Sequence, residues 1–166
     1  IFNSASTNSG IQLSSIFNYA KVNNGVQIGL INVSDSSKGV SIGLINVVKS
    51  GLGQLELSSN TLTIANVSLK TGTRRFYNTY HAGLDLADTS FVTIGIGFGT
   101  SIKLFNRFGL NFEISQHSIN KDEIDFPVVA LVTKCSPTLE FKISRKVSLF
   151  AGPEFDLLLS KTENNY

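Results

Sequence analysis

Histidine and cysteine are the residue types in this sequence best suited to metal binding or to nucleophilic and acid–base chemistry. The two histidines, His81 and His117, lack the short spacing typical of zinc ligands. We expect His81 in a strand that faces a lumen or the surface, and His117 at a solvated position beside a polar loop. Cys135 is the single cysteine, so an internal disulfide is excluded, and a buried, inert thiol is expected. The sequence therefore predicts no catalytic, cofactor-binding or metal-binding residue.

Charged residues form the remaining candidates for a site. Asp122, Glu123 and Asp125 could attract a hard cation, but their spacing matches no calcium loop, so a solvated loop is expected. Arg74 and Arg75 follow a turn-like segment and could hold phosphate or lipopolysaccharide. Other acids and lysines fall on the polar faces of expected strands, where structural ion pairing is expected rather than catalysis: Glu113, Glu140, Glu154 and Asp156, beside Lys103, Lys142 and Lys146.

Composition limits the class of protein. The 166 residues fit one domain with a core, and 16% of them are charged, below the roughly 25% typical of soluble domains. No run of about 18 apolar residues occurs, which excludes a transmembrane helix but not a membrane β-barrel. A net charge of +2 gives no indication of nucleic-acid binding. Because Met is absent, we expect that the sequence is not a complete reading frame.

A short repeat occupies the first part of the chain. The segment 25–33 (GVQIGLINV) recurs 14 residues later as 39–47 (GVSIGLINV), and a weaker copy spans 10–19. Apolar residues alternate within each copy and turn-like residues separate the copies, which predicts short β-strands. The copies could stack as a β-solenoid with an asparagine ladder, or pair as an antiparallel meander. Both arrangements stay open, and the repeated asparagines are expected to be structural rather than ligand-binding.

Longer strands are expected from about residue 74. Between Val92 and Leu104 apolar residues alternate with glycine and polar residues, over about 43 Å at about 3.3 Å per residue. A strand tilted across a bilayer needs about 9 to 11 residues, so this length favours a membrane barrel. Tight links at 105–107 and 144–146 flank the polar stretch 116–125, an alternation typical of outer-membrane barrels. A soluble sandwich or lipocalin-like barrel remains the alternative, because alternation does not show which face points outward.

Two prolines predict an irregularity in this sheet. Pro137 and Pro153 lie equally far from the link at 144–146, on opposite sides of it. A simple hairpin would place them opposite each other, and proline cannot donate to a strand ladder. The sequence therefore predicts a local break or bulge there.

Several segments together carry a family resemblance. The GVQIGLINV copies, 66–73 (NVSLKTGT) and 76–78 (FYN) resemble a family of uncharacterised Bacteroidota outer-membrane β-barrel proteins with GVQIGLIN-type surface repeats. The segments 95–100 (GIGFGT) and 148–153 (SLFAGP) are similar to the barrel strands of that family. The resemblance covers nearly the whole chain. It implies a location in the outer membrane of a Gram-negative bacterium, no known enzymatic chemistry, and further strands ending in an aromatic residue.

We therefore expect an all-β protein with two regions. Residues 1–73 would form the β-repeat region, and residues 74–166 an antiparallel outer-membrane-type β-barrel or part of one, continuous with the repeats and incomplete at its C-terminus. The expected role is that of a structural or accessory outer-membrane protein, without catalysis or cofactor. Its expected partners are outer-membrane lipid or lipopolysaccharide and other outer-membrane proteins, not nucleic acid. The alternative is a soluble, secreted β-repeat binding or adhesion module. An enzyme is a third hypothesis, and it would need a Ser/His/acid constellation, for which only two histidines are present.

Overall fold

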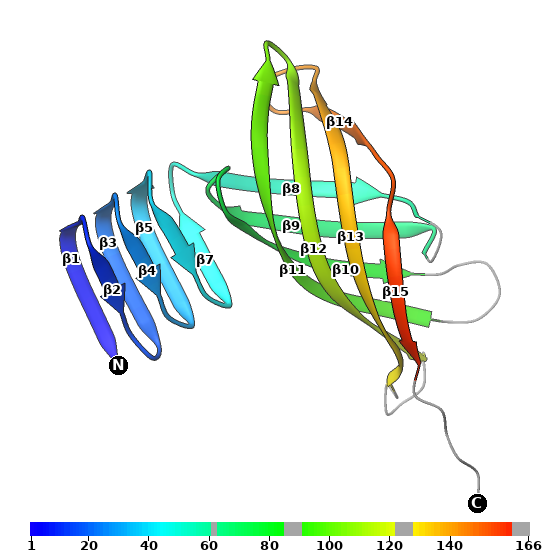
Figure 1. Ribbon diagram of the computed structural model, residues 1–166, viewed down its shortest axis with the longest axis horizontal. Helices are drawn as coiled ribbons and strands as arrows, with labels where there is room; N and C mark the ends of the chain where they lie inside the picture. The colour runs from blue at the N-terminus through cyan, green and yellow to red at the C-terminus, as the bar shows by residue number, and fades with distance from the viewer. Residues whose placement is uncertain (61–62, 85–90, 122–127, 161–166) are drawn as a thin grey trace, which may run out of the picture.

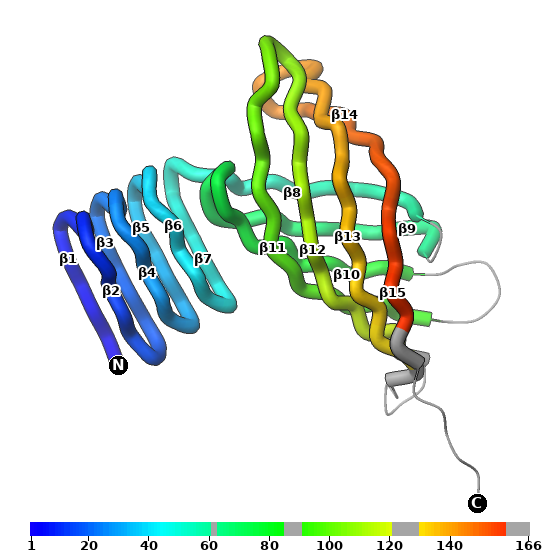
Figure 2. The backbone as a smooth tube through the Cα atoms, viewed as in Figure 1, coloured from blue at the N-terminus to red at the C-terminus, as the bar shows by residue number. Residues whose placement is uncertain are grey.

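The computed structural model describes residues 1–60, 63–84, 91–121 and 128–160, and these form β-strands and turns without a helix (Figure 1). Two parts are visible. A stack of small coils at the N-terminus lies beside a strongly curled sheet formed by the rest of the chain (Figure 2). No helix in the described part of the chain is long and apolar enough to cross a membrane.

The repeats form a solenoid-like stack rather than a meander. The long strands pair in parallel in the order β1-β3-β5-β7, and the short strands pair in parallel in the order β2-β4-β6. Phe17 lies beside Ile31, and Ile31 lies beside Ile45, so each coil advances by one repeat. The strands are β1 (Phe2–Asn8), β2 (Ile11–Leu13), β3 (Phe17–Asn23), β4 (Val26–Ile28), β5 (Ile31–Ser37), β6 (Val40–Ile42) and β7 (Ile45–Val48).

Amide and serine side chains make up most of the interior of the solenoid, and apolar ones such as Ala20 are few. Asn18 and Gln27 are fully buried and Asn32 is 1% exposed, whereas Leu30 and Leu44 are 52% and 53% exposed. The amides are linked from coil to coil: Nδ2 of Asn18 donates to Oδ1 of Asn32 at 2.8 Å. These bonds satisfy buried polar groups that would otherwise be costly, which accounts for the repeated asparagine.

A single sheet contains the remaining strands, and it begins at Leu52. The first two strands of this sheet fall within residues 1–73, yet they pair antiparallel with the later strands rather than with the repeats. The order is β14-β13-β12-β11-β10-β9-β8, with β15 also paired to β13. The strands are β8 (Leu52–Ser58), β9 (Ala65–Gly72), β10 (Tyr77–Leu84), β11 (Phe91–Phe105), β12 (Phe108–Lys121), β13 (Val128–Lys142), β14 (Ser148–Ala151) and β15 (Phe155–Ser160).

The last stretch of the sheet, formed by β14 and β15, is interrupted at Pro153. In β14, Ala151 pairs with Leu139, and in β15, Phe155 pairs with Cys135, so the register is the same on both sides of the gap. Pro153 falls in the gap, opposite Pro137. A ladder break was predicted at these two prolines, and the pairing shows it.

The sheet curls into a half-barrel whose first strands cross its last strands steeply (Figure 1). Its edges are β8 on one side and β14 with β15 on the other, and within the described strands no pairing joins the two edges. The expected all-β fold is thus confirmed, and of the two arrangements left open for the repeats the structure shows the solenoid-like one. The described residues of the sheet form an open curled sheet and not a closed barrel.

Candidate functional site

The inner face of the curled sheet carries a buried lysine between two acids. Nζ of Lys70, on β9, lies 2.6 Å from Oε2 of Glu56 on β8 and also pairs with Oε1 of Glu113 on β12. The hydroxyl of Tyr77 donates to the same Glu113 oxygen at 2.9 Å. Lys70 is 3% and Glu113 is 7% exposed. The two carboxylates compensate the buried ammonium, as the burial of a charge requires.

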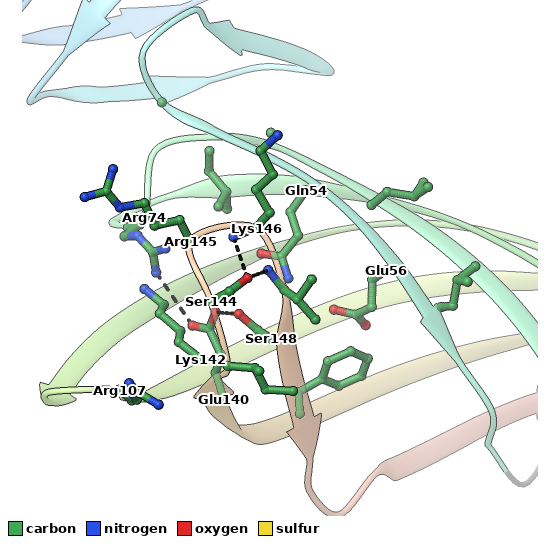
Figure 3. Close-up of a pocket in the computed structure, with 18 of the residues that line it drawn as sticks. Gln54, Glu56, Arg74, Arg107, Glu140, Lys142, Ser144, Arg145, Lys146 and Ser148 are labelled. Atoms are coloured by element: carbon green, nitrogen blue, oxygen red, sulfur yellow. Dashed lines mark hydrogen bonds and ion pairs between the residues drawn. The ribbon is translucent and has the colours of Figure 1, made fainter.

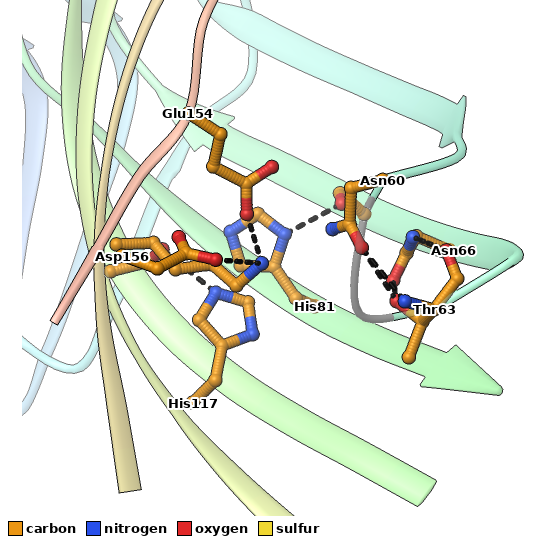
Figure 4. A network of polar contacts seen from close by, with 10 residues as sticks. Asn60, Thr63, Asn66, His81, His117, Glu154 and Asp156 are labelled. Atoms are coloured by element: carbon orange, nitrogen blue, oxygen red, sulfur yellow. Dashed lines mark hydrogen bonds and ion pairs between the residues drawn. The ribbon is translucent and has the colours of Figure 1, made fainter. Parts of the chain in front are cut away.

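A second buried lysine lies further along the same face. Nζ of Lys134, on β13, pairs with Glu154 and lies 3.8 Å from Oδ2 of Asp156 (Figure 4). Lys134 is 4% exposed. Both acids belong to the last pass of the sheet, so this cluster ties the interrupted β14–β15 edge to the strand next to it.

The two histidines meet over a glycine on this inner face (Figure 4). His81 of β10 pairs in register with Gly95 of β11, which in turn pairs with His117 of β12. Their rings lie 4.8 Å apart between centroids, and a Cβ on Gly95 would overlap the His117 ring. The expected solvated position of His117 is wrong, because β12 continues to Lys121 and its alternation turns His117 inward, where it is 6% exposed.

Each histidine has a serine neighbour. Oγ of Ser68 lies 2.7 Å from Nδ1 of His81, and Oγ of Ser115 lies 2.8 Å from Nε2 of His117. The other nitrogen of His81 contacts Thr79, a hydroxyl and not a carboxylate. A serine nucleophile of the triad type needs an acid hydrogen-bonded to its histidine, and the described hydrogen bonds of His81 and His117 include none. In the described part of the chain, no group of three potential metal ligands occurs either.

A wide cavity of about 1130 Å³ opens at the end of the half-barrel where the tight turns lie (Figure 3). Its basic residues come from three separate turns and outnumber the two acids, Glu56 and Glu140. Among its cations, Arg74 has an ion pair, at 3.6 Å from Glu140. This concentration of guanidinium and ammonium groups is suited to bind phosphate or carboxylate. The basic lining residues are Arg74, Arg107, Lys142, Arg145 and Lys146.

The predicted ion pairs are partly correct. All four of the expected acids, Asp156 included, do lie in ion pairs, but the cations are Lys70, Arg74 and Lys134. The expected partner Lys103 is exposed near the β11–β12 turn. The alternation of apolar and polar residues predicted that these acids share the polar face of the strands. Which acid reaches which cation depends on the register of the folded sheet.

Cys135 is exposed, which contradicts the buried, inert thiol expected from the sequence. It pairs in register with Ile114 and Phe155, which are also exposed, so it belongs to the outer face of the sheet.

The predicted acidic loop with Asp122, Glu123 and Asp125 lies outside the described residues. On the solenoid, Lys49 lies 2.6 Å from Asp35, and its hydrogen bond lowers the pKa of that half-buried carboxyl.

Comparisons with protein-family models, with curated proteins and with solved structures found no match.

Proposed function

We propose that this chain is a structural or accessory protein of a Gram-negative outer membrane, and that the outer face of its curled sheet contacts lipid. The proposal rests on one observation, which is the inverted distribution of polarity in the sheet. Phe98, Ile114 and Leu157 are 52%, 57% and 63% exposed, while Lys70 and Ser115 are 3% and 5% exposed. A soluble protein buries its apolar side chains, whereas a membrane strand directs them to lipid and its polar residues inward.

The dimensions of the long strands support the proposal. β11 and β13 have 15 residues each and β12 has 14. A strand tilted across a bilayer needs about 9 to 11 residues, so each of these strands is long enough to cross the hydrocarbon and extend beyond it. The buried ion pairs of the inner face would then be shielded from lipid by the sheet itself.

The basic cavity lies at one end of the long strands, and its charge indicates what kind of ligand could bind there. Arg107 and Arg145 belong to tight turns at one end of the sheet, where membrane-spanning strands would reach the headgroups. Guanidinium groups bind phosphate through paired hydrogen bonds. We propose anionic lipid headgroups, including those of lipopolysaccharide, as ligands of this end, and other outer-membrane proteins as neighbours. The proposed role includes no catalytic step.

Liposome flotation tests the proposal. The chain is refolded in the presence of phospholipid vesicles, washed at alkaline pH, and centrifuged in a density gradient. We expect it to float with the vesicles and to precipitate when neither lipid nor detergent is present, because its outer face is apolar. A stable, monodisperse monomer in detergent-free buffer that stays at the bottom of the gradient would refute membrane embedding.

A second candidate is a soluble, secreted binding or adhesion module, and the solenoid is the part that favours it. Lys21, Lys38 and Lys49 are exposed on the coils, which suits contact with water. The same flotation experiment separates the two candidates, because a soluble module needs neither lipid nor detergent.

A further inference from the structure

The two rows of corners along the solenoid differ in polarity. The corners at which a short strand leads into the next long strand line up on one side of the stack, and the corners at which a long strand leads into the next short strand line up on the other (Figure 2). The first row, called here the apolar corners, exposes Ile16, Leu30 and Leu44. The second row, called the polar corners, exposes Ser9, Asn24 and Lys38. Each coil is therefore amphipathic from one corner to the other.

The long strands change polarity in the same direction. From the apolar corner onward, the outward side chains of β3 are Phe17, Tyr19 and Lys21. The next two long strands also begin with apolar residues, and the chain reaches Asp35 and Lys49 at the position that corresponds to Lys21. The hydroxyl of Tyr19 donates to Oδ2 of Asp35 at 3.1 Å, so the phenol ring lies between the apolar and the charged part of this surface. Tyrosine is enriched at the same level of membrane proteins, where hydrocarbon meets headgroups.

The charges of the solenoid lie away from the apolar corners. Residues 1–50 contain three lysines and one aspartate, whereas the segments around the apolar corners contain no charged residue: 13–17, 28–32 and 42–46. The charged part of the coils is therefore cationic. An apolar side next to a cationic side complements an anionic lipid surface, in which charged headgroups cover hydrocarbon.

The length of a coil determines how it can meet a bilayer. A long strand of seven residues, such as β3, spans about 20 Å at about 3.3 Å per residue. The hydrocarbon core is about 30 Å thick and a spanning strand needs about 9 to 11 residues, so a coil is too short to cross. Interfacial elements insert their apolar side by about 5–10 Å. Lys21 lies four residues beyond Phe17, about 13 Å along the strand, and would then remain among the headgroups.

The apolar corners adjoin the outer face of the curled sheet. The hydroxyl of Tyr80, on β10, donates to the carbonyl oxygen of Leu44 at the last apolar corner. Tyr80 pairs in register with Leu69 and Ile96 on the neighbouring strands, and Leu69 is exposed. The last coil thus places its apolar corner beside the surface for which lipid contact is proposed.

We infer that the solenoid is an interfacial membrane-binding element. Its apolar corners insert into the hydrocarbon just below the headgroups, and its lysines contact anionic headgroups. The inference rests on the proposed membrane location of the chain and extends lipid contact from the sheet to the repeats. The amide ladder is suited to this role, because a coil whose interior is held by hydrogen bonds can direct its leucine and isoleucine side chains outward.

Fluorescent labels at three positions of the coils test the inference. In a Cys135→Ser background, Leu30→Cys and Ile42→Cys place the label on the apolar side, and Asn24→Cys places it at a polar corner; all three positions are exposed. The chain is folded into vesicles of phosphatidylcholine and phosphatidylglycerol, brominated either close to the headgroup or at the end of the acyl chain. We expect bromine to quench the labels at positions 30 and 42 several-fold more than the label at position 24. Bromine close to the headgroup should be the more effective, and aqueous iodide should quench position 24 alone.

The parent chain labelled at Cys135 separates this inference from the proposed function. Quenching by brominated lipid at position 135 but not at positions 30 and 42 would overturn the inference and leave the proposed function standing. The reverse result would refute lipid contact of the sheet and support that of the solenoid.

Two further outcomes would also overturn the inference. Labels at positions 30 and 42 that are shielded from both lipid and iodide would show that a protein partner or a second copy covers the apolar corners. Equal quenching by lipid at positions 24 and 30 would show that the coils are immersed as a whole. Positions 30 and 42 each decide the matter if the other variant fails to fold.

Discussion

Individual polar side chains are held on the inner face by a stripe of glycines in β11. Tyr77 pairs in register with Gly99, which pairs with Glu113, and the Tyr77 and Glu113 side chains hydrogen-bond across it. A Cβ on Gly99 would overlap the Tyr77 ring. Because glycine has no side chain, the side chains of β10 and β12 can contact each other across β11 on the inner face. Charged and polar groups are thus brought together, and they interact more strongly because this face is buried.

Lys70→Met should strongly destabilise the protein. The substitution keeps most of the side-chain volume but leaves Glu56 and Glu113 buried without their cation, and breaking such a group typically costs about 3–5 kcal/mol. The measurement is guanidinium unfolding in lipid or detergent. Lys103→Met is the control, because Lys103 is exposed, and a change beyond about 0.5 kcal/mol is not expected there. Equal stabilities for the two variants would show that the Lys70 cluster contributes nothing.

At the level of elements, the solenoid and the sheet are connected by hydrogen bonds between side chains. The asparagine ladder continues beyond Asn46, which donates to Oδ1 of Asn78 on β10, and Asn78 donates to the carbonyl oxygen of Gly43 at 2.8 Å. Tyr80 also donates to the carbonyl oxygen of Leu44. The first strands of the sheet therefore close the last coil of the solenoid, and the two parts are expected to stabilise each other.

Asn32→Asp should destabilise the solenoid. Nδ2 of Asn32 donates to Oδ1 of Asn46 and to the carbonyl oxygen of Ile42, and a carboxylate would place oxygen against oxygen at both points. We expect a loss of at least about 1–3 kcal/mol, the cost of leaving buried groups unsatisfied. Circular dichroism on heating measures it. Asn24→Asp introduces the same charge at an exposed position, and a comparable loss there would contradict the role of the ladder.

The whole molecule has its polarity reversed relative to a soluble domain. The coils bury amides and expose leucine and isoleucine, and the sheet buries charges and exposes phenylalanine and leucine. Asn18 and Asn32 in the coils, and Lys70 and Glu113 in the sheet, bond to each other inside the protein, as polar groups must do in a hydrocarbon environment. Across the described part of the molecule, therefore, apolar residues lie outside and charged or amide residues lie inside.

Ile114→Arg and Phe105→Arg should differ in their effect if the sheet spans a bilayer. Ile114 lies near the middle of β12, and Phe105 lies at the tight turn; both are exposed. An arginine costs about 2–4 kcal/mol at the bilayer midplane and about 0–1 kcal/mol near the interface. Urea titration of the chain folded in vesicles measures both values. Equal costs would show that membrane depth does not act on these positions.

The sequence was sufficient to predict the strands and which residues share a face of each strand, because the alternation of apolar and polar residues is a local property. It predicted the repeats, the tight turns and the break at Pro153, but not the choice between solenoid and meander, which depends on pairing between coils. The charged clusters could not be predicted, because Lys70 and Glu113 are 43 positions apart and meet only through the register of four strands. His117 was misplaced because a polar strand facing inward has the composition of a loop.

The native thiol of Cys135 offers the most direct test of the central claim, that the outer face of the sheet contacts lipid. An environment-sensitive fluorophore is attached to Cys135 in the parent chain, or to position 136 in the double variant Cys135→Ser/Ser136→Cys, since Ser136 lies on the inner face. The chain is then folded into vesicles whose acyl chains carry bromine as a quencher. We predict strong quenching of the label at position 135 and weak quenching at position 136. Quenching of the label at position 135 by aqueous iodide, with no effect of the brominated lipid, would contradict the claim.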